Sequence, residues 1–259
     1  NLRLRRSAST PSQSYRPLER RAKRFFFTSI HDDSVGGNSD PANEKAPQSW
    51  DWNEINVSPN YSAKFENVVV SYGTTGIKAI SLNSQYKNLE IKNSQIKNNG
   101  TGIDLLNVSP TIESNVISDN DTGIATQLYA NYPTRTVTLR YNVISGNKKM
   151  GITANNSFAL MPPTVDAEQN WWGDPSGPKG NQKNPGGKGD IVNDFWVSFN
   201  PWLQEDFTKT FDPVIVIPGI MGSWNKDGKL TIDPIFHTYD NLCEEFLANG
   251  YEDGNKFSD

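Results

Sequence analysis

Apolar and polar residues recur in one fixed order across the middle of the chain. Five copies of a short pattern, each punctuated by Asn or Gly, begin at Phe65, Ile91, Ile112, Leu139 and Ala167. Successive copies start 21 to 28 residues apart, a repeat length that indicates a solenoid. In a solenoid each copy forms one coil and buries its apolar side only against its neighbours.

Alignment of the copies places apolar residues in three columns, with a glycine before each member of the third. β-branched residues dominate two of the columns, which favours strands over helices. Parallel strands stack about 4.8 Å apart, so like residues lie over like residues. We therefore predict an all-β parallel β-helix with an aliphatic interior. The columns are Phe65, Ile91, Ile112, Leu139, Ala167; Val70, Ile96, Ile117, Ile144, Trp172; and Ile77, Ile103, Ile124, Ile152.

Two polar columns separate the apolar ones. Asn tolerates left-handed backbone, so we expect these residues to form the sharp bends between strands: Ser94, Asn115, Asn142, Asn170; and Asn99, Asn120, Asn147. A charged column alternates in sign: Glu66, Lys92, Glu113, Arg140, Glu168. Stacked opposite charges indicate a structural ladder. A polysaccharide-cleaving groove is the alternative.

Charge is spread unevenly over the 259 residues, whose net charge is −4. Residues 1–24 carry eight Lys or Arg and one Glu, and we predict a disordered basic segment there, with an anionic partner as the alternative. The acidity of the rest gives no reason to expect nucleic acid as a partner. Cys243 is the single cysteine, and no run of 18 apolar residues predicts a membrane span.

Candidate binding residues lie before the first copy and in one insertion. A strand at 25–30 precedes an acidic turn, where Asp32, Asp33 and Asp40 are candidate Ca²⁺ ligands, with a solvated turn as the alternative. Trp50 and Trp52 either close the first coil or form a sugar-stacking platform. In repeat proteins, insertions often form the binding face, which makes Tyr129 and Tyr132 candidates.

The motif NWWGDPSGP at 170–178 predicts the end of the stack, because large rings cover the open apolar end and Gly/Pro breaks stop further strands. A tryptophan pair that stacks on a ligand is the alternative. We expect a last strand at 195–203, so that the solenoid spans 25–203. With FTSIHDDSVGGN and the Asn/Gly-rich copies, this motif resembles the right-handed parallel β-helix modules, of the pectin-lyase-like kind, of bacterial secreted and surface proteins. The resemblance implies an extracellular or cell-surface location.

After a connector at 204–211, the sequence VIVIPGIMGSW begins a different pattern in 212–259. An apolar run before a Pro-Gly loop indicates a buried parallel strand, a further short strand is expected at 229–232, and PIFHTYDNLCEEFLANG indicates a helix. This region resembles the opening of a lecithin:cholesterol acyltransferase-like α/β-hydrolase. The resemblance implies that the backbone N–H groups of Ile220 and Met221 are oxyanion donors.

No G-x-S-x-G nucleophile motif occurs in the 259 residues. We therefore expect a truncated strand-loop-helix unit without catalytic activity of its own. The first functional hypothesis is a non-catalytic β-helix domain of an ester hydrolase that acts on a lipid or ester substrate. The alternative is a surface module that binds glycans or proteins and has no enzymatic role.

Overall fold

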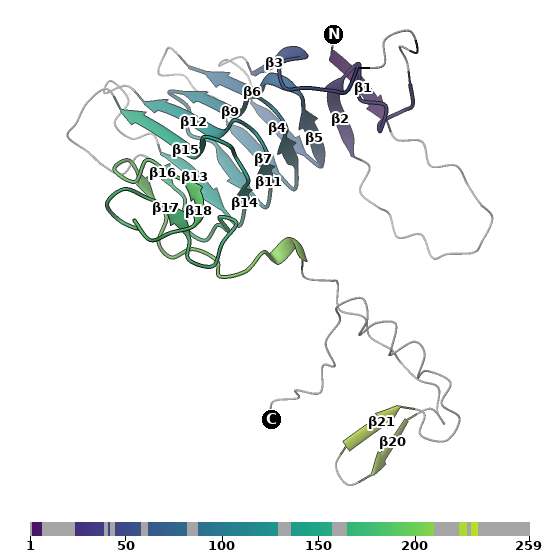
Figure 1. Cartoon of the computed structure of the whole chain (residues 1–259), viewed down its shortest axis with the longest axis vertical. Helices are drawn as coiled ribbons and strands as arrows, with labels where there is room; N and C mark the ends of the chain where they lie inside the picture. Colours follow the sequence, from purple (N-terminus) through teal and green to yellow (C-terminus); the bar gives the residue numbers. More distant parts are fainter. Residues whose placement is uncertain are drawn as a thin grey trace. The chain divides into compact units, whose positions relative to one another are not determined.

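The computed structural model describes residues 2–6, 24–38, 41, 45–57, 62–81, 88–128, 136–156, 165–209, 223–226 and 229–232. The chain divides into two compact units, Asn1–Asp206 and Phe207–Asp259. The first unit is a stack of short strands in three sheets (Figure 1). No helix of the described part of the chain is long and apolar enough to cross a bilayer.

Each full coil contributes one strand to each sheet, in the order sheet I, sheet II, sheet III. Sheet I holds β4 (Ala63–Glu66), β7 (Leu89–Lys92), β10 (Thr111–Glu113), β13 (Val137–Arg140), β16 (Val165–Asp166) and β19 (Val197–Ser198). Sheet II holds β1 (Leu2–Arg6), β2 (Phe25–Ser29), β5 (Val68–Ser71), β8 (Gln95–Lys97), β11 (Val116–Ser118) and β14 (Val143–Ser145). Sheet III holds β3 (Trp52–Val57), β6 (Gly73–Ile80), β9 (Thr101–Leu106), β12 (Thr122–Leu128) and β15 (Met150–Asn156).

The strand register confirms the three predicted apolar columns. Ile91 pairs with Ile112 in sheet I, Ile96 with Ile117 in sheet II and Ile103 with Ile124 in sheet III, all in parallel. These isoleucines are fully buried and form one continuous core. The aliphatic interior is therefore built by stacking like on like, and the fold is a parallel β-helix.

Most of the difference in coil length falls at one corner of the stack. From the first to the third apolar column the chain takes the same number of steps in three of the four complete copies, and one more in the copy that begins at Leu139. The connection from sheet III to sheet I differs far more. It is four residues, Asn107–Pro110, between β9 and β10, whereas eight residues, 129–136, separate β12 from β13. Added chain therefore leaves the register of the strands unchanged.

The glycine before each third-column isoleucine is required by close approach of the coils. A Cβ added to Gly102 would lie 2.6 Å from the carbonyl oxygen of Gly123, and one added to Gly123 would lie 2.6 Å from that of Gly151. Any larger residue here would force two coils apart. The glycine column therefore sets the spacing of sheet III at its start.

The asparagine columns lie in the bends between strands, as predicted: Asn115 falls between β10 and β11, and Asn142 between β13 and β14. They do not themselves supply the left-handed backbone. The residue before each one takes the left-handed backbone, as at Ser114 (φ 57°) and Tyr141 (φ 54°). Asn115 and Asn142 are themselves fully buried. A buried amide must satisfy its donors and acceptor within the protein, and these side chains do so by bonding from coil to coil.

We name the two stacks by their members: the first asparagine ladder (Ser94, Asn115, Asn142, Asn170) and the second asparagine ladder (Asn99, Asn120, Asn147). In the first, the backbone N and Nδ2 of Asn115 both donate to Asn142 Oδ1, at 2.9 and 3.0 Å. Asn142 repeats the pattern toward Asn170 Oδ1, at 2.8 and 2.9 Å. Its Nδ2 also donates to the carbonyl of Ile112 in the preceding coil at 2.9 Å.

The alternating charged column is in register but only partly paired. Glu113 lies between Lys92 and Arg140 in the strand register, and the Lys92–Glu113 ion pair is 3.1 Å long. Arg140 pairs instead with Asp166, and Glu66 pairs with Lys64 at 2.8 Å. Each exposed pair contributes roughly 0–1 kcal/mol. The ladder is therefore a minor structural element, and its charges are already in use.

Both ends of the stack are covered. At the C-terminal end Trp172 is fully buried and its ring meets Phe199 edge-on at 6.4 Å, so the tryptophan motif closes the core and leaves no indole face for a ligand there. The residues after it, 173–206, form what we call the C-terminal cap, which includes β17 (Pro178–Lys179) and β18 (Gly189–Ile191) (Figure 1).

Two predicted segments differ from the structure. The strand expected at 195–203 is limited to β19, because Pro201 has no N–H with which to extend a ladder. Leu2–Arg6, expected to be disordered with the rest of 1–24, forms β1 and pairs antiparallel with β2. An uncovered edge strand offers free backbone donors and acceptors, which β1 satisfies.

In the second unit, a 3₁₀ turn at Phe207–Lys209 is followed by β20 (Ser223–Lys226) and β21 (Lys229–Ile232), which pair antiparallel. The strand predicted at 229–232 is therefore confirmed. The predicted buried strand, Pro-Gly loop and helix lie outside the described residues.

Replacing Asn142 with Ala should destabilise the protein by about 3 kcal/mol or more, because several buried partners lose their bonds at once. Urea unfolding of the full chain measures this change. Asn56→Ala is the matched control, since Asn56 is exposed and bonds only to Glu54; it should cost less than about 0.5 kcal/mol. Equal costs for both variants would contradict a structural role of the ladder.

Thr126 points into the core between Leu105 and Ala154, and its buried hydroxyl has no partner. Thr126→Val should raise the free energy of unfolding by about 1 kcal/mol, because an unpaired polar atom becomes a methyl group of similar size. Thr138→Val, at a half-buried position of sheet I, serves as the control in the same unfolding assay. A loss of stability in Thr126→Val would show that the hydroxyl is satisfied in solution.

Candidate ligand-binding site

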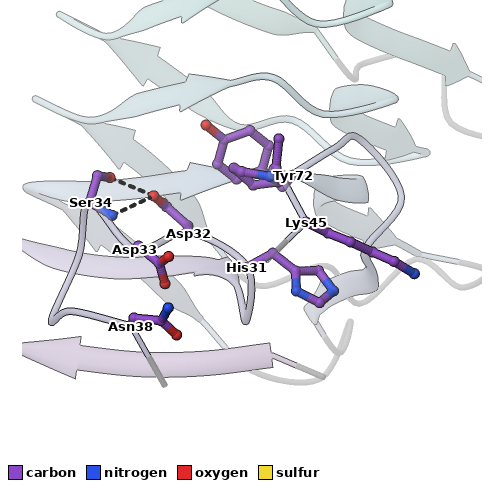
Figure 2. Close-up of a pocket in the computed structure, with 9 residues that line it drawn as sticks. His31, Asp32, Asp33, Ser34, Asn38, Lys45 and Tyr72 are labelled. Atoms are coloured by element: carbon purple, nitrogen blue, oxygen red, sulfur yellow. Dashed lines mark hydrogen bonds between the residues drawn. The ribbon is translucent and has the colours of Figure 1, made fainter. Parts of the chain in front are cut away.

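A polar pocket of about 520 Å³ lies at the N-terminal end of the stack. It is formed by the turn after β2, by the segment before β3 and by the residue after β5. Figure 2 shows an acidic and polar side, formed by Asp32, Asp33, Ser34 and Asn38, and an opposite side with His31 and Lys45. The residues that line it are His31, Asp32, Asp33, Ser34, Asn38, Lys45, Ala46, Pro47 and Tyr72.

Asp32 holds the acidic wall together. Its Oδ2 accepts a hydrogen bond from Thr28 Oγ1 at 2.5 Å, and its Oδ1 accepts from the N and Oγ of Ser34 at 3.2 and 2.5 Å. Asp33 and Lys45, by contrast, form no hydrogen bond or ion pair with any residue that the structure describes. The pocket therefore has a fixed frame, and its Asp33 carboxylate and Lys45 ammonium group are unpaired among the described residues.

Asp51 holds the opposite wall. Its Oδ2 accepts from Ser29 Oγ at 2.5 Å and from the backbone N of Gln48 at 3.0 Å, which fixes the segment before β3 against β2. The N–H of Asp51 donates to the carbonyl of Tyr72 at 3.0 Å. Three separate stretches of chain therefore meet at the pocket through the hydrogen bonds of Asp51.

Tyr72 was not singled out in the sequence analysis. It has left-handed backbone (φ 66°) at the corner between sheets II and III, which turns its ring toward the pocket (Figure 2). Burial raises the pKa of its hydroxyl, and the carboxylates of Asp32 and Asp51 raise it further. A hydrogen bond with Asn98 lowers this pKa but does not outweigh the other effects. The tyrosine therefore stays neutral at physiological pH. The signal that could have identified Tyr72 in the sequence is its position just after the second apolar column of the first copy, where a bend is expected.

Trp50 lies beside this corner and is 60% exposed. Its backbone is also left-handed (φ 77°). A Cβ on Gly100 would lie 2.0 Å from Trp50 Nε1, so the indole rests directly on the bare backbone of that glycine. Ser49, just before it, donates from Oγ to Asn98 O at 3.0 Å. Trp50 is therefore an exposed aromatic ring whose position is fixed. It does not line the pocket, but the residue after it, Asp51, is bonded to Tyr72, which does.

Trp52 has a different role. It is 5% exposed, its Nε1 donates to Ser71 O at 2.8 Å, and Gly73 packs against its ring. Of the two proposed uses, closing the first coil is the one that fits this buried position, so only Trp50 remains as a stacking platform.

The other predicted site residues are not brought together by the described structure. Tyr129 and Tyr132, the oxyanion candidates Ile220 and Met221, and Asp40 lie outside the described residues. Within the described ranges, no three His, Cys, Asp or Glu side chains converge as a metal site. Calcium binding at the acidic turn remains a prediction, although Asp32 already uses both oxygens in hydrogen bonds.

A second cluster of titratable groups lies on sheet III. Lys78 Nζ is 3.0 Å from Glu54 Oε2, and Lys78 is the register partner of Asp104. Burial raises the pKa of Asp104, an effect that Lys78 opposes, whereas hydrogen bonds from Asn56 and Lys78 outweigh burial and lower the pKa of Glu54. The sequence analysis missed this cluster because Glu54 precedes the aligned copies. Its charges are paired, as expected for a structural cluster.

Comparison with known proteins supports the repeat. Residues 48–171 match the family model described as a right handed beta helix region. No curated protein and no solved structure matches the chain. The matched segment covers coils whose strands pair in parallel in all three sheets. Residues 48–171 are therefore a right-handed parallel β-helix repeat.

Proposed function

We propose that the β-helix is a non-catalytic module that binds carbohydrate at the surface formed by Trp50 and the adjacent polar pocket. The observation that carries this proposal is the exposed, immobilised indole of Trp50. An aromatic ring kept in water sacrifices burial of a large apolar surface, and such rings commonly serve in recognition.

The chemistry of the surroundings matches a polyhydroxylated ligand. A sugar ring has an apolar C–H face that packs on an indole, and hydroxyl groups that need donors and acceptors at its edge. Asp33 and Lys45 supply one acceptor group and one donor group in the pocket, which the segment before Trp50 helps to line through Lys45, Ala46 and Pro47. The site is open and polar, which favours binding of part of a longer glycan over enclosure of a small molecule.

Binding is favoured over catalysis by the use of the carboxylates. Asp32 accepts hydrogen bonds on both carboxylate oxygens, and Asp51 accepts two on Oδ2, in the bonds that hold the walls. A general acid or base must exchange its proton with the substrate, which these two groups are not free to do. They preorganise the site, and preorganisation lowers the entropic cost of binding.

Trp50→Ala should weaken the binding of any glycan identified on a broad array by about tenfold or more, since a stacked indole is replaced by a methyl group. Calorimetric titration of the full chain measures the dissociation constant. Tyr141→Ala is a matched control: Tyr141 is also an exposed aromatic at a left-handed corner, 43% exposed with φ 54°. Both substitutions leave a non-glycine residue in the left-handed region, so backbone strain is equal.

Two outcomes would contradict the proposal. The first is silence of the unmodified chain across the array. The second is equal weakening by Trp50→Ala and Tyr141→Ala, which would indicate a general loss of structure. Cell-surface glycans are the ligands we expect, in keeping with an extracellular or surface location.

We further propose that this module accompanies an ester hydrolase. The support is the sequence at 211–253, where an apolar run, a Pro-Gly loop and a helical pattern resemble the lecithin:cholesterol acyltransferase-like lipases and esterases. On this proposal the N–H groups of Ile220 and Met221 stabilise an oxyanion, and the substrate is a lipid or other ester. Reading the coding sequence downstream of Asp259 is the test. A G-x-S-x-G motif followed by Asp and His supports the proposal, and an immediate stop codon contradicts it.

A further inference from the structure

The second asparagine ladder ends on an aspartate from the C-terminal cap. Along this ladder, the N and Nδ2 of Asn120 donate to Asn147 Oδ1 at 3.2 and 3.0 Å. Asn147 then donates in the same way to Asp190 Oδ2, at 3.1 and 2.7 Å. Asp190 therefore takes the place of the next asparagine, with a carboxylate where the repeat has an amide.

The backbone of Asp190 also ties the cap to the stack. Its N–H donates to Trp172 O at 3.0 Å, and the N–H of Asn193 donates to Ile152 O in β15 at 3.2 Å. The side chain packs closely over the last coil, since a Cβ on Gly151 would lie 2.7 Å from Asp190 Cβ. Asp190 therefore joins the β18 side of the cap to the last coil, while β19 joins the other side of the cap to β16 in sheet I.

No cation compensates the Asp190 carboxylate among the residues that the structure describes. Lys148 and Lys149 both bond to Asp121, at 3.4 and 3.2 Å, and Lys188 acts on Asp174. The one charged neighbour that acts on Asp190 is another carboxylate, Asp119.

The environment of Asp190 therefore disfavours its ionised form. Burial raises the pKa of Asp190 to about 6, an effect opposed by the N–H groups of Asn147 and Gly146 and reinforced by Asp119. An unfolded aspartate titrates near 3.9. Between these two values the folded chain holds a proton that the unfolded chain has released, so this stabilising contribution is complete below about pH 4 and is lost as the pH rises through about 6.

We propose that Asp190 is a pH-sensitive latch, which binds the C-terminal cap to the last coil more tightly when the side chain is protonated than when it is ionised. The latch is built into the end of the asparagine ladder. An asparagine at this position would keep the cap closed at every pH, because the amide is always neutral.

Amide hydrogen exchange in the full chain tests the latch. The protection factors of the Asp190 and Asn193 amides, corrected for intrinsic exchange, should fall by about tenfold to a hundredfold between pH 4.5 and pH 7.5. In Asp190→Asn they should stay constant over this range and match the acidic value. Equal pH dependence in both proteins would overturn the proposal.

Asp194→Asn is the matched control within the same cap. Asp194 is buried, and its Oδ2 accepts from the backbone N of Gln182 and Lys183 at 2.5 and 2.7 Å, away from the ladder. This variant should retain the pH dependence of the unmodified chain; its loss there would overturn the proposal. A direct NMR titration of the Asp190 carboxyl group serves as a readout independent of any variant. A midpoint below about 4.5 would also overturn the latch.

Discussion

The structure depends on buried amides that bond from one coil to the next in exact register. A slip of one residue would turn every inward side chain outward, because strand side chains alternate between faces. Asn115 and Asn142 oppose such a slip, since their side chains satisfy both the neighbouring asparagine and a main-chain carbonyl of the preceding coil. A thin aliphatic core alone specifies register weakly, and the ladders add the directional bonds that it lacks.

The same register positions the candidate site. Tyr72 follows β5 at a corner that recurs in every coil, and the corner residue of the next coil, Asn98, receives hydrogen bonds from both Ser49 and Tyr72. The N-terminal segment is therefore held against a rigid, repeating surface. Trp50 gains a fixed position from the glycine at this corner, although no neighbouring side chain encloses it. A rigid scaffold thus supports an exposed group that few contacts would otherwise hold.

Much of the repeat was predictable because it is written in the sequence several times over. The apolar columns, such as Ile96 with Ile117, were found from spacing alone and match the observed pairing. The asparagines were placed correctly in the bends, but their coil-to-coil bonding was not predicted. Local preference accounts for Asn in a turn, whereas the burial of Asn142 follows from the stacking of coils. The meeting of Asp32, Asp51 and Tyr72 at the pocket was not predictable, since they are far apart in sequence and the two aspartates precede the repeated copies. Trp50 and Trp52 looked equivalent in the sequence, and only the fold separates an exposed ring from a buried one.

Coil length varies most at one corner, between sheet III and sheet I. The four residues Asn107–Pro110 suffice to join β9 to β10, while other coils use longer connections there. The stack therefore accommodates longer connections at this edge while the strands keep their register. Sequence diversity gained by insertion would accumulate along that edge as a row of adjacent segments. A protein built this way can acquire new surface residues while its three stacked sheets stay constant. Changes in recognition are then separated from changes in folding.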